Sequence, residues 1–249
     1  MNITLLALRR LWTGLFYTNS AITFLTLFPL FYVYLFKEKW YEKAFQLKKL
    51  WAKLTVRNAG IKYEIVSETV LDKNQTYIFC PNHTSYLDIM MMYLTIPNFF
   101  YTIGKIELNK IPLFKTFYGK LNIPVDRTSL RNRHDAYSKA AEVIDKGISM
   151  TFFPEGTIPD HTPKLGRFKN GPFKLAIEKQ IPVVPVTFIN NWKILPSGRR
   201  RKRGGQPGKV FSFLHAPIET KGLTLDHLED LKRETFQVIQ NKLREYAGK

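Results

Sequence analysis

The sequence contains a single cysteine, Cys80, among its 249 residues. No disulfide can therefore form within the chain, and a metal site built from several cysteine thiolates is excluded. Cys80 ends an apolar run at residues 76–79, where a cysteine is typically buried and unreactive, so it is not predicted to be a nucleophile. Nothing in the cysteine content indicates an oxidising compartment.

Acidic residues are also scarce. The chain has 20 Asp and Glu against 38 Lys and Arg, which gives a formal net charge of +18. A surface this basic attracts polyanions such as nucleic acid, anionic lipid or phosphorylated substrates. The sequence resembles no helix-turn-helix, no RNP-type aromatic strand and no zinc finger, so nucleic acid is not a predicted partner. A non-catalytic binder of anionic lipid or nucleic acid is the alternative from a different functional class.

Several enzyme signatures are missing. The chain has no Gly-x-Ser-x-Gly elbow, no Walker loop, no Gly-x-Gly-x-x-Gly turn and no internal repeats. It therefore lacks the signatures of a serine hydrolase, a P-loop NTPase and a dinucleotide-binding enzyme. Its hydrophobic content of 45% is enough to bury one full-sized core, which predicts one catalytic domain with an appendage.

Charged residues are absent from residues 11–36, and basic residues flank this run on both sides. A bilayer core needs about 20 apolar helical residues, so the run is long enough to cross a membrane. Four polar residues interrupt it and Pro29 would kink a helix; the four are Thr13, Thr18, Asn19 and Ser20. Three interpretations follow: a spanning helix over about 21–36, a helical pair in one leaflet, or a cleaved signal peptide, which the pattern favours least. We expect residues 1–36 to associate with a membrane and residues 37–249 to form the catalytic domain.

Short β-rich runs alternate with helical patterns beyond residue 60. The predicted strands are residues 61–66, 76–80, 99–103, 122–125, 150–153, 183–188 and 209–214. The predicted helices are an amphipathic one at 37–58 and others at 129–146, 173–179 and 225–246. This alternation predicts an α/β fold: a mixed, largely parallel sheet of about seven strands flanked by helices, with an N-terminal apolar helical membrane segment. Residues 197–209 contain five consecutive basic residues and are predicted to be a mobile loop that meets anionic lipid headgroups.

The most informative segment is Asn-His-Thr-Ser-Tyr-Leu-Asp at residues 82–88, directly after an apolar strand. His83, at the exit of the strand, is expected at the edge of the sheet, and Asp88 lies about one helical turn further on. At this spacing a carboxylate can hold one ring nitrogen of the histidine and raise the basicity of the other, as general-base catalysis requires. A structural histidine at a strand–helix junction is the alternative. No second ligand stands at metal-binding spacing, so no metal site is predicted.

A second cluster, Phe-Pro-Glu-Gly-Thr at residues 153–157, also follows an apolar strand. Gly156 permits a tight turn, and Glu155 is expected to point from the strand end toward the cleft that the histidine occupies. An ordinary turn with an exposed Glu is the alternative. Polar turns after neighbouring strands are how an open α/β sheet builds a site at its carboxyl edge.

Four blocks together resemble the 1-acylglycerol-3-phosphate (lysophosphatidic acid) acyltransferase family. Residues 82–88 resemble its His-x4-Asp signature, and residues 153–157 resemble its Phe-Pro-Glu-Gly-Thr block. Two further blocks, Ile-Pro-Val-Asp-Arg at 123–127 and Ile-Pro-Val-Val-Pro-Val at 181–186, stand in the family's order. A joint match of four ordered blocks has a small probability of arising by chance.

This resemblance implies a role for each matching residue. His83 would be the general base and Asp88 its orienting partner. Lys105 and Arg127 would bind the phosphate of the acceptor, because an Arg offers a fixed fork of donors to phosphate oxygens and a Lys adds a point charge. The acceptor pocket would be shaped by the residues of the second turn, Glu155, Gly156 and Thr157.

One position departs from the family pattern. The family commonly has Arg after Phe-Pro-Glu-Gly-Thr, whereas this chain has Ile158. A phosphate ligand is therefore missing at this place, and the hypothesis is that Arg167 or Lys169 supplies the charge instead. The departure also keeps a lyso-aminolipid open as an alternative acceptor.

The resemblance implies a 1-acyl-sn-glycerol-3-phosphate acyltransferase that converts lysophosphatidic acid to phosphatidic acid. His83 would deprotonate the acceptor hydroxyl, which attacks the thioester of acyl-CoA or an acyl carrier protein, and a backbone amide near the second turn would steady the oxyanion. The predicted partners are this donor, the lysophospholipid and the bilayer, and no cofactor beyond the co-substrate is expected. The predicted location is a membrane, monotopic or single-pass, with the active site at the cytoplasmic face.

Overall fold

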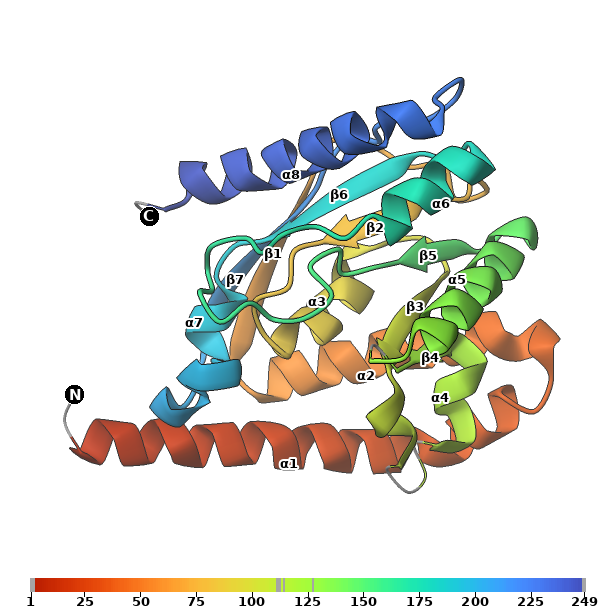
Figure 1. Cartoon of the computed structure of the whole chain (residues 1–249). Helices are drawn as coiled ribbons and strands as arrows, with labels where there is room; N and C mark the ends of the chain where they lie inside the picture. The colour runs from red at the N-terminus through yellow and green to blue at the C-terminus, as the bar shows by residue number, and fades with distance from the viewer. Residues whose placement is uncertain (1–2, 111–112, 114, 127, 248–249) are drawn as a thin grey trace.

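A computed structural model describes residues 3–110, 113, 115–126 and 128–247 (Figure 1). Within these residues a single sheet runs through seven strands in the order β1-β7-β6-β2-β5-β3-β4. The strands are β1 (Ile61–Ser67), β2 (Ile78–Pro81), β3 (Phe100–Lys105), β4 (Asn122–Val125), β5 (Ser149–Thr151), β6 (Val183–Phe188) and β7 (Gly208–Leu214). Each strand lies within two residues of its predicted limits.

The sheet is mixed. Strands β2 to β6 run parallel to one another. Strand β7 pairs antiparallel with β6, and the edge strand β1 pairs parallel with β7. The carboxyl ends of β2, β3, β4, β5 and β6 therefore meet at one edge of the sheet, where ligands bind in folds of this kind. The predicted fold class is confirmed.

Helices cover both faces of the sheet (Figure 1). In the described part of the chain they are α1 (Ile3–Tyr34), α2 (Tyr41–Asn58), α3 (Leu87–Thr95), α4 (Lys115–Leu121), α5 (Leu130–Asp145), α6 (Gly171–Lys179), α7 (Asn191–Ile194) and α8 (Leu228–Glu245). Short 3-10 helices are η1 (Glu38–Trp40), η2 (Ile106–Lys110), η3 (Gly198–Arg203) and η4 (Leu225–His227). The predicted basic loop thus contains η3, and the predicted amphipathic helix at 37–58 begins as η1.

Alternate residues of β2 face two separate cores. Phe79 packs with α2 and α3 on one face of the sheet. Ile78 and Cys80 pack with α5, α6 and α8 on the other. Cys80 is fully buried and unpaired, and this burial raises the pKa of its thiol. Because the short strand β2 is covered on both faces, the turn that follows it starts from a fixed position.

The N-terminal apolar run forms one helix, α1, and Pro29 lies inside it without dividing it. Of the four polar residues that interrupt the run, Thr13, Asn19 and Ser20 face the protein body, whereas Thr18 is exposed. Asn19 donates to the Thr55 carbonyl at 2.9 Å, and the Ser20 carbonyl accepts from the Trp51 indole at 2.9 Å, so α1 is fixed to α2. The Thr13 hydroxyl accepts from the Gly205 amide at 2.7 Å, just beyond η3.

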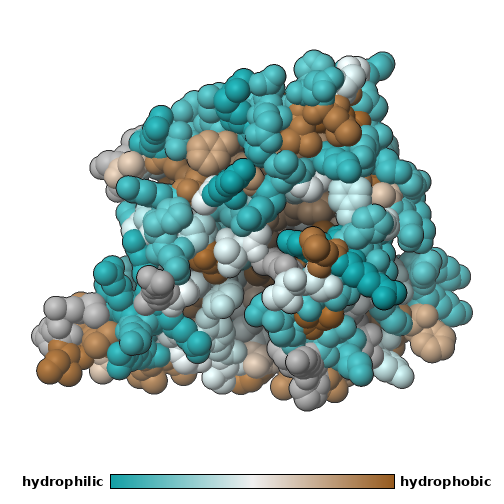
Figure 2. Space-filling view, viewed as in Figure 1, coloured by the Kyte–Doolittle hydropathy of each residue, from teal (hydrophilic) through white to brown (hydrophobic). Residues whose placement is uncertain are grey.

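The opposite side of α1 is apolar and exposed. Large hydrophobic side chains there include Leu8, Leu11, Leu15, Ile22 and Leu25. Hydrophobic residues gather along the lower edge of the molecule in Figure 2, where α1 runs in the same view of Figure 1. By length and composition, α1 is the one helix of the described residues that is able to cross a membrane.

Candidate active site

A histidine and a carboxylate meet just beyond β2. His83 Nδ1 lies 2.9 Å from Asp88 Oδ2, and Asp88 stands in the first turn of α3. The Asp88 side chain is fully buried, and 14% of the His83 side chain is exposed. Because Nδ1 contacts the carboxylate, the neutral imidazole carries its proton on Nδ1, and Nε2 is the basic nitrogen. Among the described residues, Nε2 has no hydrogen-bond partner.

Four donors besides His83 surround the Asp88 carboxylate. Oδ2 accepts from the backbone amides of Thr84 and Ser85 at 2.5 and 2.8 Å. Oδ1 accepts from the Thr84 hydroxyl at 3.4 Å and from Asn191 Nδ2 at 2.8 Å. A buried carboxylate needs such donors because it has lost its water. The turn before α3 is therefore folded around the charge of Asp88.

Glu155 connects this turn to the segment that contains Gly166. Its Oε1 accepts from the His83 backbone amide at 2.7 Å, and its Oε2 accepts from the Gly166 amide at 2.6 Å. Burial raises the pKa of Glu155 to about 7, against the opposing effect of the two amide donors. The carboxylate thus lies beside His83 as expected, but both of its oxygens bind the backbone.

An aromatic ring covers one face of the imidazole. Phe153, two residues beyond β5, stacks on His83 with ring centroids 4.0 Å apart and an interplanar angle of 23°. Since β5 is the neighbour of β2 in the sheet, the two turns are forced together. The stacked ring restricts rotation of His83 and keeps water from one of its faces.

The other predicted residues lie around the same edge of the sheet. Lys105 ends β3 and is mostly exposed, with its Nζ 3.0 Å from Glu107. Gly156 has a φ of +74°, which favours glycine, and Thr157 is exposed. Arg167 and Lys169 are exposed on the segment that Glu155 holds through Gly166. Arg127 lies outside the described residues.

Comparison with known proteins gives the family. A sequence model described as "Acyltransferase" matches residues 62–189, about half of the chain. The chain belongs to the acyltransferase family. Asp88, His83 and Glu155 all lie within the matched region of this acyltransferase.

Its relatives carry more specific names. The chain is 31% identical over 174 residues to a chloroplastic 1-acyl-sn-glycerol-3-phosphate acyltransferase, BAT2, of Brassica napus, covering 69% of this chain and 49% of that protein. It is 30% identical over 195 residues to the Homo sapiens 1-acyl-sn-glycerol-3-phosphate acyltransferase alpha, covering 76% of this chain and 66% of that protein. The match thus spans about half the length of the plant relative.

The fold has a solved counterpart. The crystal structure of the Thermotoga maritima 1-acyl-sn-glycerophosphate acyltransferase, PlsC, superposes with a TM-score of 0.80 at 24% identity, and the match covers 98% of both chains. The similarity includes the N-terminal part of the chain, which the family model does not reach.

Sequence reasoning missed Asn191, which donates to Asp88 from the start of α7. It stands three residues beyond β6, and β6 is the other neighbour of β2. The rule that placed Glu155, a polar residue just beyond a parallel strand, applies equally to Asn191. The order of the strands was the missing information.

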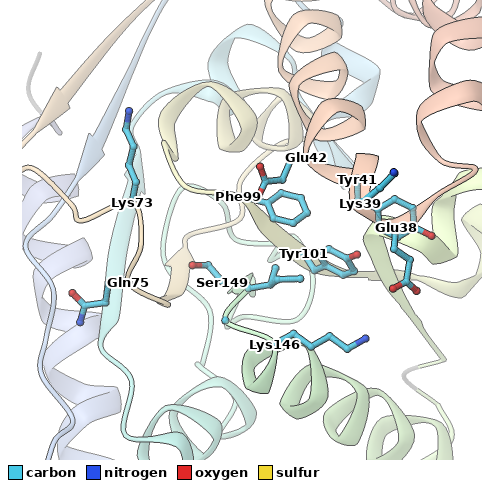
Figure 3. A pocket seen from close by; sticks show the side chains of 12 residues that line it. Glu38, Lys39, Tyr41, Glu42, Lys73, Gln75, Phe99, Tyr101, Lys146 and Ser149 are labelled. Carbon is cyan, nitrogen blue, oxygen red and sulfur yellow. The ribbon is translucent and has the colours of Figure 1, made fainter.

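A polar cavity of about 420 Å³ lies at the opposite edge of the sheet (Figure 3). Its lining comes from the amino ends of β3 and β5, with Phe99 and Ser149, and from the start of α2, with Tyr41. Lys73 and Lys146 also line it. None of the predicted site residues lines it, so this cavity is separate from the His83 site.

Proposed function

We propose that this chain is a 1-acyl-sn-glycerol-3-phosphate acyltransferase, which transfers an acyl chain from a thioester to the sn-2 hydroxyl of lysophosphatidic acid. The observation that carries the proposal is the His83–Asp88 pair, with Nδ1 held at 2.9 Å and Nε2 without a partner among the described residues. The names of the plant and human relatives, at 31% and 30% identity, support the choice of acceptor.

The reaction follows from this arrangement. His83 Nε2 removes the proton from the acceptor hydroxyl as its oxygen attacks the thioester carbonyl carbon. The tetrahedral intermediate then expels the thiolate, which takes the proton back from the imidazolium. An ester bond forms, a thioester bond breaks, and a thiol is released. No enzyme nucleophile is required because the thioester is already activated.

Asp88 supports the charge that develops in this step. The imidazolium formed at His83 is 2.9 Å from a carboxylate that is fixed from several sides. A preorganised charge of this kind stabilises the transition state without reorganisation. Phe153, stacked on the ring, presents its π-face to the same cation.

Basic residues at the carboxyl edge would bind the phosphate. Lys105 ends β3. Arg127, which lies outside the described residues, is a proposed phosphate ligand from the sequence alone. Arg167 and Lys169 belong to the segment that Glu155 attaches to the His83 turn. We propose that they replace the charge missing at Ile158. The half-buried, uncharged Ile158 also supports a second candidate acceptor, a lyso-aminolipid.

We propose that α1 attaches the enzyme to one leaflet of a membrane. A helix of 32 residues is about 48 Å long, well beyond the hydrocarbon core of a bilayer. Its inner side is bonded to α2 through Asn19 and Ser20 and to the loop after η3 through Thr13, which opposes a transverse orientation. Its exposed leucines would enter the leaflet while the basic η3 meets headgroups.

A lysolipid panel tests the proposal. Purified protein is incubated with acyl-CoA or an acyl carrier protein thioester and with lysophosphatidate, lysophosphatidylethanolamine or an ornithine-based lysolipid, and the products are read by mass spectrometry. Phosphatidic acid as the main product supports the proposal, whereas acylation of an aminolipid alone selects the second candidate. Lipid binding without turnover of any acceptor would make the chain a non-catalytic binder and refute both.

A further inference from the structure

Asn191 is held inside the protein against the Asp88 carboxylate. Its side chain is fully buried at the first position of α7, and its Nδ2 lies 2.8 Å from Asp88 Oδ1. The residue lies outside the region 62–189 that the family model matches. Of the donors around Asp88, it is the one that arrives from a distant part of the chain, 103 residues away.

The two neighbouring asparagine amides are used differently. Asn82 binds both the N–H and the carbonyl of Phe188, at 2.7 and 3.0 Å. Asn190 bonds the Lys209 carbonyl and the Phe211 amide, at 2.8 and 3.1 Å. Each of these amides satisfies its oxygen and its nitrogen on backbone groups, as an amide that stabilises a fold does.

Asn191 satisfies only one end of its amide. Its Oδ1 is buried and has no donor among the described residues, while its Nδ2 donates to the Asp88 carboxylate. A buried polar atom without a partner destabilises the folded state, so the amide is not placed to satisfy its own two ends, and the bond to Asp88 is what its position provides. A bond from an amide N–H to a carboxylate is charge-assisted and directional, which is what positioning a charge requires.

We infer that Asn191 is a positioning residue of the active site: it fixes Oδ1 of Asp88 so that Oδ2 faces His83. This inference rests on the proposed acyl transfer by His83. Asn191 is fully buried and its bonded end faces Asp88, so its effect on the reaction passes through the dyad. Its removal should therefore lower kcat and leave the KM values for both substrates unchanged.

Two substitutions separate positioning from packing. Asn191→Leu keeps the volume and removes the donor. Asn191→Asp keeps the shape but places a second carboxylate against Asp88, and two adjacent carboxylates tend to share one proton. As the pH falls, the shared proton restores a donor toward Asp88. The matched control is Asn190→Ala, which removes an adjacent amide that hydrogen-bonds the backbone of β7.

The experiment measures kcat and KM for lysophosphatidate and acyl-CoA with the full chain in detergent, from about pH 6 to about pH 8.5, and normalises rates to the folded fraction from circular dichroism. We expect Asn191→Leu to lower kcat about 10- to 100-fold at every pH, with KM values within about twofold. The ratio of the Asn191→Asp kcat to the wild-type kcat should rise at least about 10-fold toward acid pH. Asn190→Ala should lower the melting temperature and keep kcat within about twofold.

Three results would overturn the inference. These are a normal kcat in Asn191→Leu, a kcat ratio for Asn191→Asp that does not change with pH, and unfolding of both Asn191 variants, which would make the residue structural. An inactive wild-type protein instead contradicts the proposed function. The two failures are therefore distinguishable.

Discussion

Replacing Asp88 by asparagine tests whether the site depends on the charge of this residue or only on its shape. The new amide has one oxygen where the carboxylate has two. We expect this oxygen to stay at the Oδ2 position, because His83 and the amides of Thr84 and Ser85 all donate there. The new NH₂ group would then face Asn191, whose unpaired Oδ1 can rotate inward to accept from it.

The expected change in stability is small. The three hydrogen bonds at Oδ2 lose a charged acceptor, which removes about 1 kcal/mol each; the Asn191 bond at Oδ1 is kept with its direction reversed, and the relief from burying a charge offsets part of the loss. A net destabilisation of about 0–2 kcal/mol lowers the melting temperature by at most about 8 °C in a chain of this size. The tautomer of His83 is retained, so the loss falls on the transition state, where the imidazolium no longer faces a negative charge.

We therefore expect kcat to fall by about 100- to 10,000-fold in Asp88→Asn with little change in KM. The assay combines initial rates of phosphatidic acid formation with thermal unfolding followed by circular dichroism. His83→Ala is the comparison, because it removes the base and leaves the four other donors on Asp88. A kcat of Asp88→Asn within about fivefold of wild type would refute the role assigned to the charge.

Three further predictions concern the surrounding residues. Burial raises the pKa of Glu155 to about 7, so between about pH 4.5 and about pH 7 the folded state keeps a proton that the unfolded state has lost. The free energy of unfolding of wild type should therefore fall by up to about 3 kcal/mol as the pH rises over this range, and that of Glu155→Gln should not. Urea unfolding at each pH will measure both. Phe153→Leu removes the ring stacked at 4.0 Å on His83 and should lower kcat about 10-fold with a loss of about 1 kcal/mol in stability; an unchanged kcat would reduce the ring to a packing role. Because Arg167 and Lys169 are exposed, changing both to Ala should leave the melting temperature unchanged and raise the KM for lysophosphatidate about 10-fold, and an unchanged KM would exclude them as phosphate ligands.

The strands were predictable because each is a short β-rich run bounded by turn residues. The His83–Asp88 pair was also accessible, since five residues of separation at a strand–helix junction bring the two side chains together locally. The order of the strands was not accessible, because it depends on which runs pair across long distances. That order decides that β5 and β6 flank β2.

The strand order also limits what sequence reasoning could say about the residues around the site. Glu155 lies beside His83 as expected, with both of its oxygens bound to the backbone of His83 and Gly166, and its role in shaping the acceptor pocket stays a prediction. Asn191 was missed because β6 was not known to lie beside β2. In α1, Asn19 looked like an interruption of an apolar run, and the bond from its side chain to the Thr55 carbonyl of α2 explains its presence.

The central claim is that His83 acts as a general base in acyl transfer to a lysophospholipid. The most direct test compares wild-type protein and His83→Ala in the conversion of lysophosphatidate and acyl-CoA to phosphatidic acid, with vesicle flotation as a measure of membrane binding. We predict that wild type forms phosphatidic acid, and that His83→Ala loses at least about 1,000-fold in kcat while it floats with vesicles as wild type does. Near-normal turnover by a folded His83→Ala protein would contradict the account.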